Sequence, residues 1–197
     1  MWKIGLTGSI ATGKSTALEA FADLGVPVFS SDAAVHDLYR GEAVPLVGQL
    51  FPGVIINGEI DRQKLSAALL ADSARLSELE AVVHPLVRKR ISAFLANAEQ
   101  KGSAIAVVDI PLLYEGGFDY GLDRVIVTVV DEATQRRRVL ARPGMNVEKL
   151  DAILARQMSQ DEKRKRADYV FDTSGPIERT RGEVAALVAA LRANPKA

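Results

Sequence analysis

The chain has 197 residues, which is enough for one domain with a well-buried core and an insertion. Its 25 Lys and Arg residues balance 25 Asp and Glu residues, so no overall charge favours nucleic acid or a membrane surface. The absence of cysteine excludes disulfides and thiolate chemistry, and no apolar run approaches the length of a membrane span. We therefore expect a cytoplasmic protein whose partners are neither nucleic acids nor membranes.

A phosphate-binding loop is predicted near the start of the chain. Gly8, Gly13, Lys14 and Ser15 fit the pattern of Gly, four residues, then Gly-Lys-Ser/Thr. A buried strand is predicted before the loop and a helix from about 14 to 24 after it, so N–H groups and the helix N-terminus can converge on phosphate. Lys14 would add charge near the β- and γ-phosphates, and the Ser15 hydroxyl would bind Mg²⁺.

The order of strands and helices predicts an α/β fold. Strand, helix and strand over residues 2–29 form the first half of a doubly wound fold. Later buried strands are expected at 104–110, 124–130 and 169–171, which favours a three-layer P-loop kinase fold with a central, mostly parallel sheet. Residues 41–101 are predicted to be a helical insertion in a single domain whose core is about 1–40 and 102–197. Within it, His84-Pro85 predicts the end of one helix and the start of another.

Acidic residues follow two of the predicted strands, at the edge where ligands of such folds bind. Asp32 could accept the proton of an acceptor hydroxyl that attacks the γ-phosphate, or it could only cap the next helix. Spacing favours neither alternative. Asp109 has the position of a carboxylate that orders Mg²⁺, and Glu115 adds a second carboxylate whose role stays open.

A lid over about residues 136–158 is predicted from two helices joined by Pro143-Gly144. Arg138 and Arg142 are four residues apart and so share a helix face, where guanidinium groups could bind phosphate oxygens. A closed lid would keep water from the phosphoryl group.

The basic run at 163–166 is interpreted as a solvated helix end, because the chain is neutral and the run lacks interleaved aromatics.

Two positions in the insertion have alternative interpretations. His84 on its own suggests a helix-boundary residue whose ring is satisfied locally. Arg88 offers positive charge to an anionic substrate, or it belongs to a solvated helix face. Taken together, the residues indicate a small P-loop kinase; a different small-molecule kinase, nucleoside or shikimate-like, and a non-catalytic nucleotide-binding regulator are the alternatives.

The motifs resemble those of the dephospho-CoA kinase family. The matching stretches, in the family's order, are LTGSIATGKST at 6–16, Asp32, HPLVRKR at 84–90, DIPLLYE at 109–115, RRRVLAR at 136–142 and ARQMSQDEKRKRADYVFDTSG at 155–175. The resemblance implies phosphorylation of the ribose 3′-hydroxyl of dephospho-CoA by ATP with Mg²⁺, giving coenzyme A and ADP, the last step of coenzyme A biosynthesis. We expect a monomer or a small homo-oligomer.

The resemblance also implies roles for individual residues. Asp32 is the implied base, and His84 and Arg88 approach the acceptor, which reverses the interpretation of His84 above. Catalysis is assigned to Asp32, Lys14, Arg138 and Arg142, and the metal to Ser15 and Asp109. The implied ATP-binding residues are Gly8, Ala11, Thr12, Gly13, Lys14, Ser15, Thr16, Ser174 and Gly175.

Two departures from the family's pattern bear on the ATP site. Thr173-Ser174 stands where family members often have Asn, which affects side-chain contacts with adenine but not backbone contacts. Ser9 and Ala11 replace glycines of the loop, so we expect that neither position has a positive φ.

Overall fold

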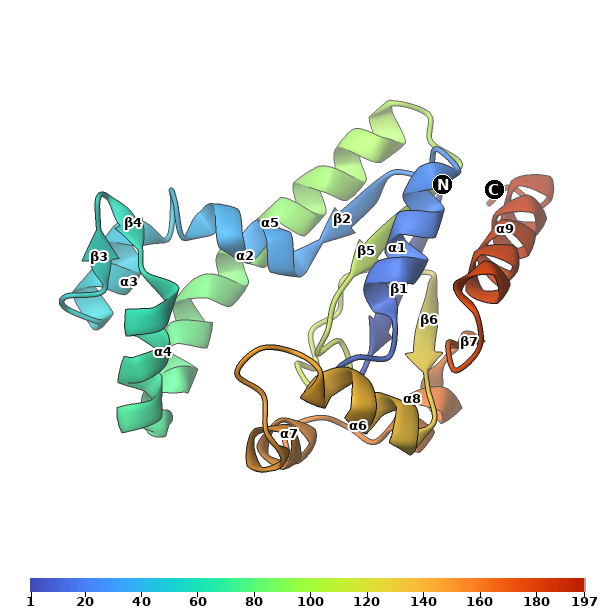
Figure 1. Cartoon of the computed structure of the whole chain (residues 1–197). Coiled ribbons are helices and arrows are strands. Elements are labelled where there is room, and N and C mark those ends of the chain that lie inside the picture. Colours follow the sequence, from blue (N-terminus) through green and yellow to red (C-terminus); the bar gives the residue numbers. More distant parts are fainter. Residues whose placement is uncertain (197) are drawn as a thin grey trace. The chain divides into compact units, whose positions relative to one another are not determined.

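The computed structural model describes residues 1–196 (Figure 1). The chain divides into two compact units. The core unit comprises Met1–Phe29 and the chain from Leu95 onward, and the inserted unit comprises Ser30–Phe94. No helix in the described part of the chain is long and apolar enough to cross a membrane. The core unit is thus built from both ends of the sequence, and the inserted unit from one continuous stretch.

A five-stranded sheet runs through the core unit and confirms the predicted α/β class. Its strands, in spatial order, are β2 (Val28–Ser30), β5 (Ile105–Asp109), β1 (Trp2–Gly8), β6 (Arg124–Val129) and β7 (Tyr169–Asp172). β1 pairs in parallel with both β5 and β6, and β6 pairs in parallel with β7. The carboxyl ends of these strands therefore meet at one edge of the sheet.

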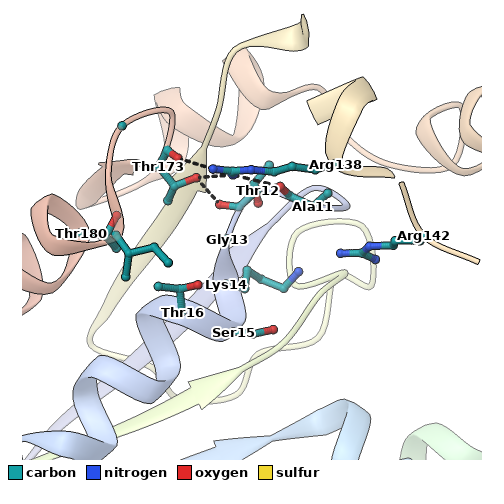
Figure 2. Close-up of a pocket in the computed structure, with 12 residues that line it drawn as sticks. Ala11, Thr12, Gly13, Lys14, Ser15, Thr16, Arg138, Arg142, Thr173 and Thr180 are labelled. Carbon is teal, nitrogen blue, oxygen red and sulfur yellow. Dashed lines mark hydrogen bonds between the residues drawn. The ribbon is translucent and has the colours of Figure 1, made fainter. Parts of the chain in front are cut away.

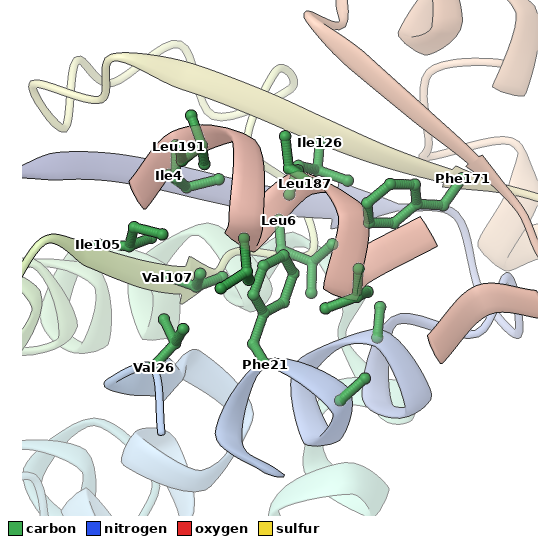
Figure 3. Close-up of a cluster of buried hydrophobic side chains, with 14 residues drawn as sticks. Ile4, Leu6, Phe21, Val26, Ile105, Val107, Ile126, Phe171, Leu187 and Leu191 are labelled. Atoms are coloured by element: carbon green, nitrogen blue, oxygen red, sulfur yellow. The ribbon is translucent and has the colours of Figure 1, made fainter. Parts of the chain in front are cut away.

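Two helices pack against each other and share the main core with the sheet: α1 (Lys14–Asp23) and α9 (Ile177–Ala193). Figure 3 shows Phe21 of α1 and Leu187 of α9 among the strand side chains Ile4, Leu6 and Val107. Phe21, Ile4 and Leu6 are completely buried. Burial of each such side chain stabilises the fold by roughly 1.5–3 kcal/mol, so the packing of α1 fixes the helix that follows the phosphate loop.

The remaining helices of the core unit lie between β6 and β7 in the sequence. They are α6 (Glu132–Leu140), α7 (Val147–Leu154) and α8 (Gln160–Arg166). Asp131 caps α6 by accepting a hydrogen bond from the Thr134 N–H, and Asn146 caps α7. These caps place two separate helices on either side of Pro143-Gly144, as the sequence predicts.

The inserted unit is mainly helical, as expected. It contains α2 (Ser31–Leu38), α3 (Val44–Leu50), α4 (Arg62–Ala71), a 3₁₀ turn (Ser73–Arg75) and most of α5 (Leu76–Gln100). A two-residue hairpin, β3 (Ile55–Ile56) and β4 (Glu59–Ile60), turns at Asn57-Gly58, where both residues have positive φ. Asp61 caps α4 through the N–H groups of Gln63 and Lys64.

The predicted helix break at His84-Pro85 is wrong. α5 runs through it without interruption and holds Pro85 in its interior. Buried apolar side chains recur at one-turn spacing along this helix, at Leu79, Val83, Val87, Ile91 and Leu95. A proline inside a helix costs about 3 kcal/mol through a lost hydrogen bond and a steric clash. The continuous apolar row on both sides of Pro85 offsets that cost.

Replacing Pro85 with Ala should therefore stabilise the protein. Alanine restores the missing backbone N–H, and we expect the free energy of unfolding in urea to rise by about 1–3 kcal/mol. Pro45 is the matched control because it lies in the first turn of α3, where proline fits, so Pro45→Ala should leave stability unchanged or slightly lower. A loss of stability in Pro85→Ala would contradict this account of α5.

Candidate active site

The phosphate loop connects β1 to α1 and leaves the start of that helix open. Gly13 is the N-cap residue of α1, with φ of 84°, and no side chain in the described part of the chain caps the helix. The first N–H groups of a helix have no partner within the helix, and together they carry a partial positive charge. The loop therefore offers hydrogen-bond donors to an anion.

Thr173 approaches the loop so closely that Gly13 cannot carry a side chain. A Cβ atom at Gly13 would lie 2.9 Å from Thr173 Oγ1, far inside van der Waals contact. The same Oγ1 donates a hydrogen bond of 2.9 Å to the Thr12 carbonyl. Position 13 therefore requires glycine for two reasons: a positive φ and the close approach of Thr173. The hydrogen bond from Thr173, in the turn after β7, holds the loop in place.

Ala11 has φ of 58°, so the expectation that position 11 avoids positive φ is wrong; Ser9 does avoid it. A left-handed conformation costs an L-residue roughly 1–2 kcal/mol, because Cβ crowds the carbonyl oxygen. Such strain persists only where contacts with the surrounding structure impose the conformation. One of these contacts is the hydrogen bond of 3.4 Å that the Ala11 carbonyl accepts from Arg138 Nη1.

A pocket of about 360 Å³ opens over the loop (Figure 2). It brings together nine of the predicted site residues and three that sequence analysis did not assign. The lining residues are Ala11, Thr12, Gly13, Lys14, Ser15, Thr16, Arg138, Arg142, Thr173, Gly175, Ile177 and Thr180. The lining thus combines the cations Lys14, Arg138 and Arg142 with one large apolar side chain, Ile177, which is 55% exposed.

The two lid arginines do different things. Arg138 donates to the Thr173 carbonyl at 2.8 Å and to Thr173 Oγ1 at 3.2 Å, in addition to Ala11. Arg142 is exposed, and Figure 2 shows its guanidinium projecting into the same space as the Lys14 ammonium. Arg138 therefore braces the loop, whereas Arg142 and Lys14 present positive charge to the pocket.

Ser174 is part of the framework of the turn and does not line the pocket. Its hydroxyl accepts a hydrogen bond from the Asp131 N–H at 3.1 Å, and its own N–H donates to Asp172 Oδ1 at 2.9 Å. Hydrogen bonds from the Ser174 hydroxyl and N–H lower the pKa of the Asp172 carboxyl, because they stabilise its charged form. Gly8 also lies outside the lining, but its carbonyl accepts from Lys14 Nζ at 3.3 Å.

Asp109 lies at the edge of the sheet where the phosphate loop begins. It is the last residue of β5, is paired in register with Leu6 of β1, and is 5% exposed. No group of three or more His, Cys, Asp or Glu residues within residues 1–196 could hold a metal ion by itself. The Ser15 hydroxyl and the Asp109 carboxylate are hard oxygen donors that fit Mg²⁺, which normally takes further ligands from phosphates and water.

Lys163 contradicts the interpretation of residues 163–166 as a solvated helix end. Its side chain is 0% exposed and forms an ion pair of 2.8 Å with Glu115, which is 16% exposed. Glu115 also accepts a hydrogen bond from the Met158 N–H at 2.8 Å. The other three basic residues of the run are exposed, as predicted. Glu115 therefore anchors the loop after β5 to α8.

The remaining predicted residues belong to the inserted unit. Asp32 is exposed in the first turn of α2, whose N-cap is Ser30: the Ser30 Oγ accepts from the Ala33 N–H at 3.3 Å. The cap of this helix is thus not Asp32, and its carboxylate faces solvent. His84 and Arg88 lie one turn apart on α5 and so share a face, because the helix is continuous.

The model of the dephospho-CoA kinase family matches residues 2–179. This chain belongs to the dephospho-CoA kinase family. Dephospho-CoA kinase from Rhodopseudomonas palustris is 51% identical over 193 residues, which cover 98% of this chain and 97% of that protein.

Solved structures agree with this family assignment. A crystal structure from Thermus thermophilus superposes with a TM-score of 0.80 at 34% identity, covering 96% of this chain and 97% of that one. Dephospho-CoA kinase from Campylobacter jejuni gives a TM-score of 0.74 at 26% identity, covering 98% of each chain. The chain is therefore a kinase with the P-loop fold.

Sequence analysis missed several residues of the core unit that make long-range contacts. Thr173, which holds the phosphate loop, was noted only as a departure from the family's Asn, and Lys163, the ion-pair partner of Glu115, only as part of a charge run. Gln135, which donates to the loop from α6, had no pattern to mark it. Each is polar in a helix or turn, where solvent exposure is the usual outcome, so no local signal distinguished them.

Ala11→Gly should increase stability because glycine adopts the left-handed conformation without strain. After allowing for the greater freedom of glycine in the unfolded chain, we expect a gain of about 0.5–1 kcal/mol in thermal or urea unfolding. Ala22→Gly, in the regular helix α1, is the control and should lose up to about 1 kcal/mol. Equal losses in both variants would mean that position 11 is not strained.

Lys163→Met should be strongly destabilising. It leaves the Glu115 carboxylate partly buried without its cation, for which we expect a loss of about 3–5 kcal/mol in urea unfolding. Lys165→Met, at an exposed position of the same helix, should change stability by less than about 0.5 kcal/mol. Combining Lys163→Met with Glu115→Gln should recover much of the loss, and no recovery would argue against the ion pair as the cause.

Proposed function

We propose that the residues described above carry out the reaction of the dephospho-CoA kinase family. In this reaction ATP phosphorylates the ribose 3′-hydroxyl of dephospho-CoA, and coenzyme A and ADP are formed, as the last step of coenzyme A biosynthesis. The observation that carries the proposal is the pocket over the phosphate loop, in a chain that the family model matches over residues 2–179. The protein would act in the cytoplasm as a monomer or a small homo-oligomer.

The pocket divides into parts that suit the parts of ATP. N–H groups of the loop and of the first turn of α1 would bind the β- and γ-phosphates, as in other P-loop proteins. Gly175 and the exposed Ile177 also line the pocket, and their backbone and apolar surface would suit the nucleobase. Ser174 would support this part of the lining through the turn, since its hydroxyl is bonded to the Asp131 N–H.

Lys14 and Arg142 would act on the transferring phosphoryl group. In phosphoryl transfer the protein contributes mainly positioning and electrostatic stabilisation of the equatorial oxygens. A mobile ammonium from the loop and a guanidinium from the lid can both follow the phosphoryl group as it moves from donor to acceptor. Arg138 would contribute through the loop that it braces, because its two terminal nitrogens donate to two carbonyls and a hydroxyl of the loop and of the turn after β7.

Ser15 and Asp109 are the residues that would hold Mg²⁺. When bound, the ion would neutralise charge on the β- and γ-phosphate oxygens. Ser15 follows Lys14 directly at the start of α1, and Asp109 ends the strand next to β1, so the sequence order of the motif and the register of the sheet support the pair. Glu115 is left to its ion pair with Lys163.

Asp32 would be the general base of the inserted unit. Its carboxylate is exposed and is not the cap of α2, so it can accept the proton of the 3′-hydroxyl as that oxygen forms its bond to the γ-phosphorus and ADP departs. His84 and Arg88 share one face of α5 and would bind the acceptor's anionic groups. These three residues would select and activate the acceptor.

Asp32→Asn should separate catalysis from ATP binding. Asparagine keeps the shape but cannot take a proton, and we expect kcat to fall by about 10²–10⁴-fold while the Kd for ATP stays unchanged. Asp37→Asn, exposed on the same helix, is the control and should keep full activity. The base assignment fails if ATP affinity alone changes.

A coupled assay of ADP release tests the reaction itself. Purified protein with ATP and Mg²⁺ should release ADP with dephospho-CoA, and not with adenosine, with shikimate or without an acceptor. ADP release that is independent of dephospho-CoA, or absent with it, would contradict the proposed acceptor.

A further inference from the structure

One residue of the phosphate loop is hydrogen-bonded to glutamine side chains through both of its backbone groups. The Ile10 N–H donates to Gln157 Oε1 at 3.0 Å, and the Ile10 carbonyl accepts from Gln135 Nε2 at 2.8 Å. Gln135 lies on α6 just before the lid segment of residues 136–158, and Gln157 lies between α7 and α8 near its end. The two ends of the lid segment therefore meet at one loop residue.

A third glutamine fixes the direction of these hydrogen bonds. The Val130 N–H donates to Gln160 Oε1 at 2.9 Å, and Gln160 Nε2 donates to Gln135 Oε1 at 3.1 Å. A backbone N–H can only donate, so the oxygen of Gln160 faces Val130 and its amino group faces Gln135. The amino group of Gln135 is then directed at the Ile10 carbonyl.

These contacts complete a series along the loop. Gln157 holds the peptide group before Ile10, Gln135 holds the one between Ile10 and Ala11, Arg138 holds the next through the Ala11 carbonyl, and Thr173 holds the one after that through Thr12. The two peptide groups that flank Ala11 set its φ and ψ. Gln135 and Arg138 thus act on the left-handed residue from its two sides, and Figure 2 shows the Arg138 side.

Gln135 is well protected from water, since it is only 4% exposed. With the half-buried Gln157 and Gln160 it also lines a second pocket of about 440 Å³, which shares no lining residue with the pocket over the loop. The hydrogen bonds of the buried Gln135 amide are directional restraints, because a buried polar group that loses its partner is costly.

We infer that Gln135 and Gln157 are positioning residues for phosphoryl transfer, which hold the Ile10 peptide groups and thereby aim the following N–H groups of the loop at the phosphates of ATP. The inference rests on the proposed ATP site. It extends that site to residues that do not touch the nucleotide, and it couples the geometry of the loop to both ends of the lid segment.

Replacing amide by carboxylate distinguishes the two residues. Gln157 serves only as an acceptor, so Gln157→Glu keeps its function, whereas Gln135→Glu puts an oxygen against the Ile10 carbonyl. We expect Gln135→Glu to lower kcat and to weaken ATP binding, each by roughly 10–100-fold, and Gln157→Glu to stay within about threefold of wild type. Gln157→Met removes the acceptor oxygen, and we expect its kcat to be about tenfold lower than that of wild type. Activity near wild type in Gln157→Glu would then show that the acceptor oxygen, and not the amide as such, is needed at this position.

The charge-matched pair makes the outcomes decisive. Equal losses in Gln135→Glu and Gln157→Glu would show that added negative charge near the phosphates is the cause, and no loss in Gln135→Glu would show that the restraint is unimportant; either result overturns the inference. Gln63→Glu, on the surface of α4, is a distant control. Rates are measured well below the melting temperature of each variant, so a purely structural role would leave kcat unchanged.

ATP titration without an acceptor separates this inference from the proposed function. If wild-type protein failed to phosphorylate dephospho-CoA, the acceptor assignment would fall, but the ratio of ATP dissociation constants between Gln135→Glu and Gln157→Glu would still decide the positioning role. A ratio of about ten or more supports the role, and a ratio near one overturns it.

Discussion

The phosphate loop has one internal contact that supports its shape: the Thr12 N–H and hydroxyl both donate to the Ser9 carbonyl. N–H groups that bind phosphate cannot also hold the loop, so the rest of its shape is imposed from outside, mostly through the carbonyls. In this chain four side chains, Gln157, Gln135, Arg138 and Thr173, do so for successive peptide groups. None of them is closer than 120 positions in the sequence. The shape of the phosphate loop therefore depends on tertiary structure far more than its short motif suggests.

The positively charged side chains that line the pocket make different kinds of contact. Arg138 is bonded to the loop and to the turn after β7, and Lys14 and Arg142 are the cations that we propose act on the phosphates. Electrostatic catalysis is effective when dipoles are oriented before the reaction, because no reorganisation is then needed in the transition state. Side chains that never meet the substrate can serve that orientation, and a polar residue remote from the chemistry can matter as much as one that contacts it.

The features that could be predicted from the sequence depend on residues close together in the chain, whereas the features that were missed depend on residues far apart in the chain. The phosphate loop and the strands of the main sheet follow from patterns of residues close together in the sequence, and they are where local rules place them. Pro85 and Lys163 were interpreted by the same rules and were wrong. The row of buried side chains along α5 outweighs the helix-breaking preference of proline, and Glu115, far away in sequence, gives Lys163 a buried partner. The relation of Asp32 to the phosphate loop stays a prediction.

The division of the chain into two units has a consequence for its synthesis. The inserted unit is one continuous stretch that ends at Phe94, whereas β1 pairs with β5, which begins at Ile105, and α1 packs on α9, which ends at Ala193. With translation at about 5–20 residues per second, the first strand waits at least roughly 5–20 s for its neighbours. The inserted unit can thus fold while the chain is still growing, and the pocket over the phosphate loop is completed only once α9, which contributes Ile177 and Thr180 to its lining, has left the ribosome.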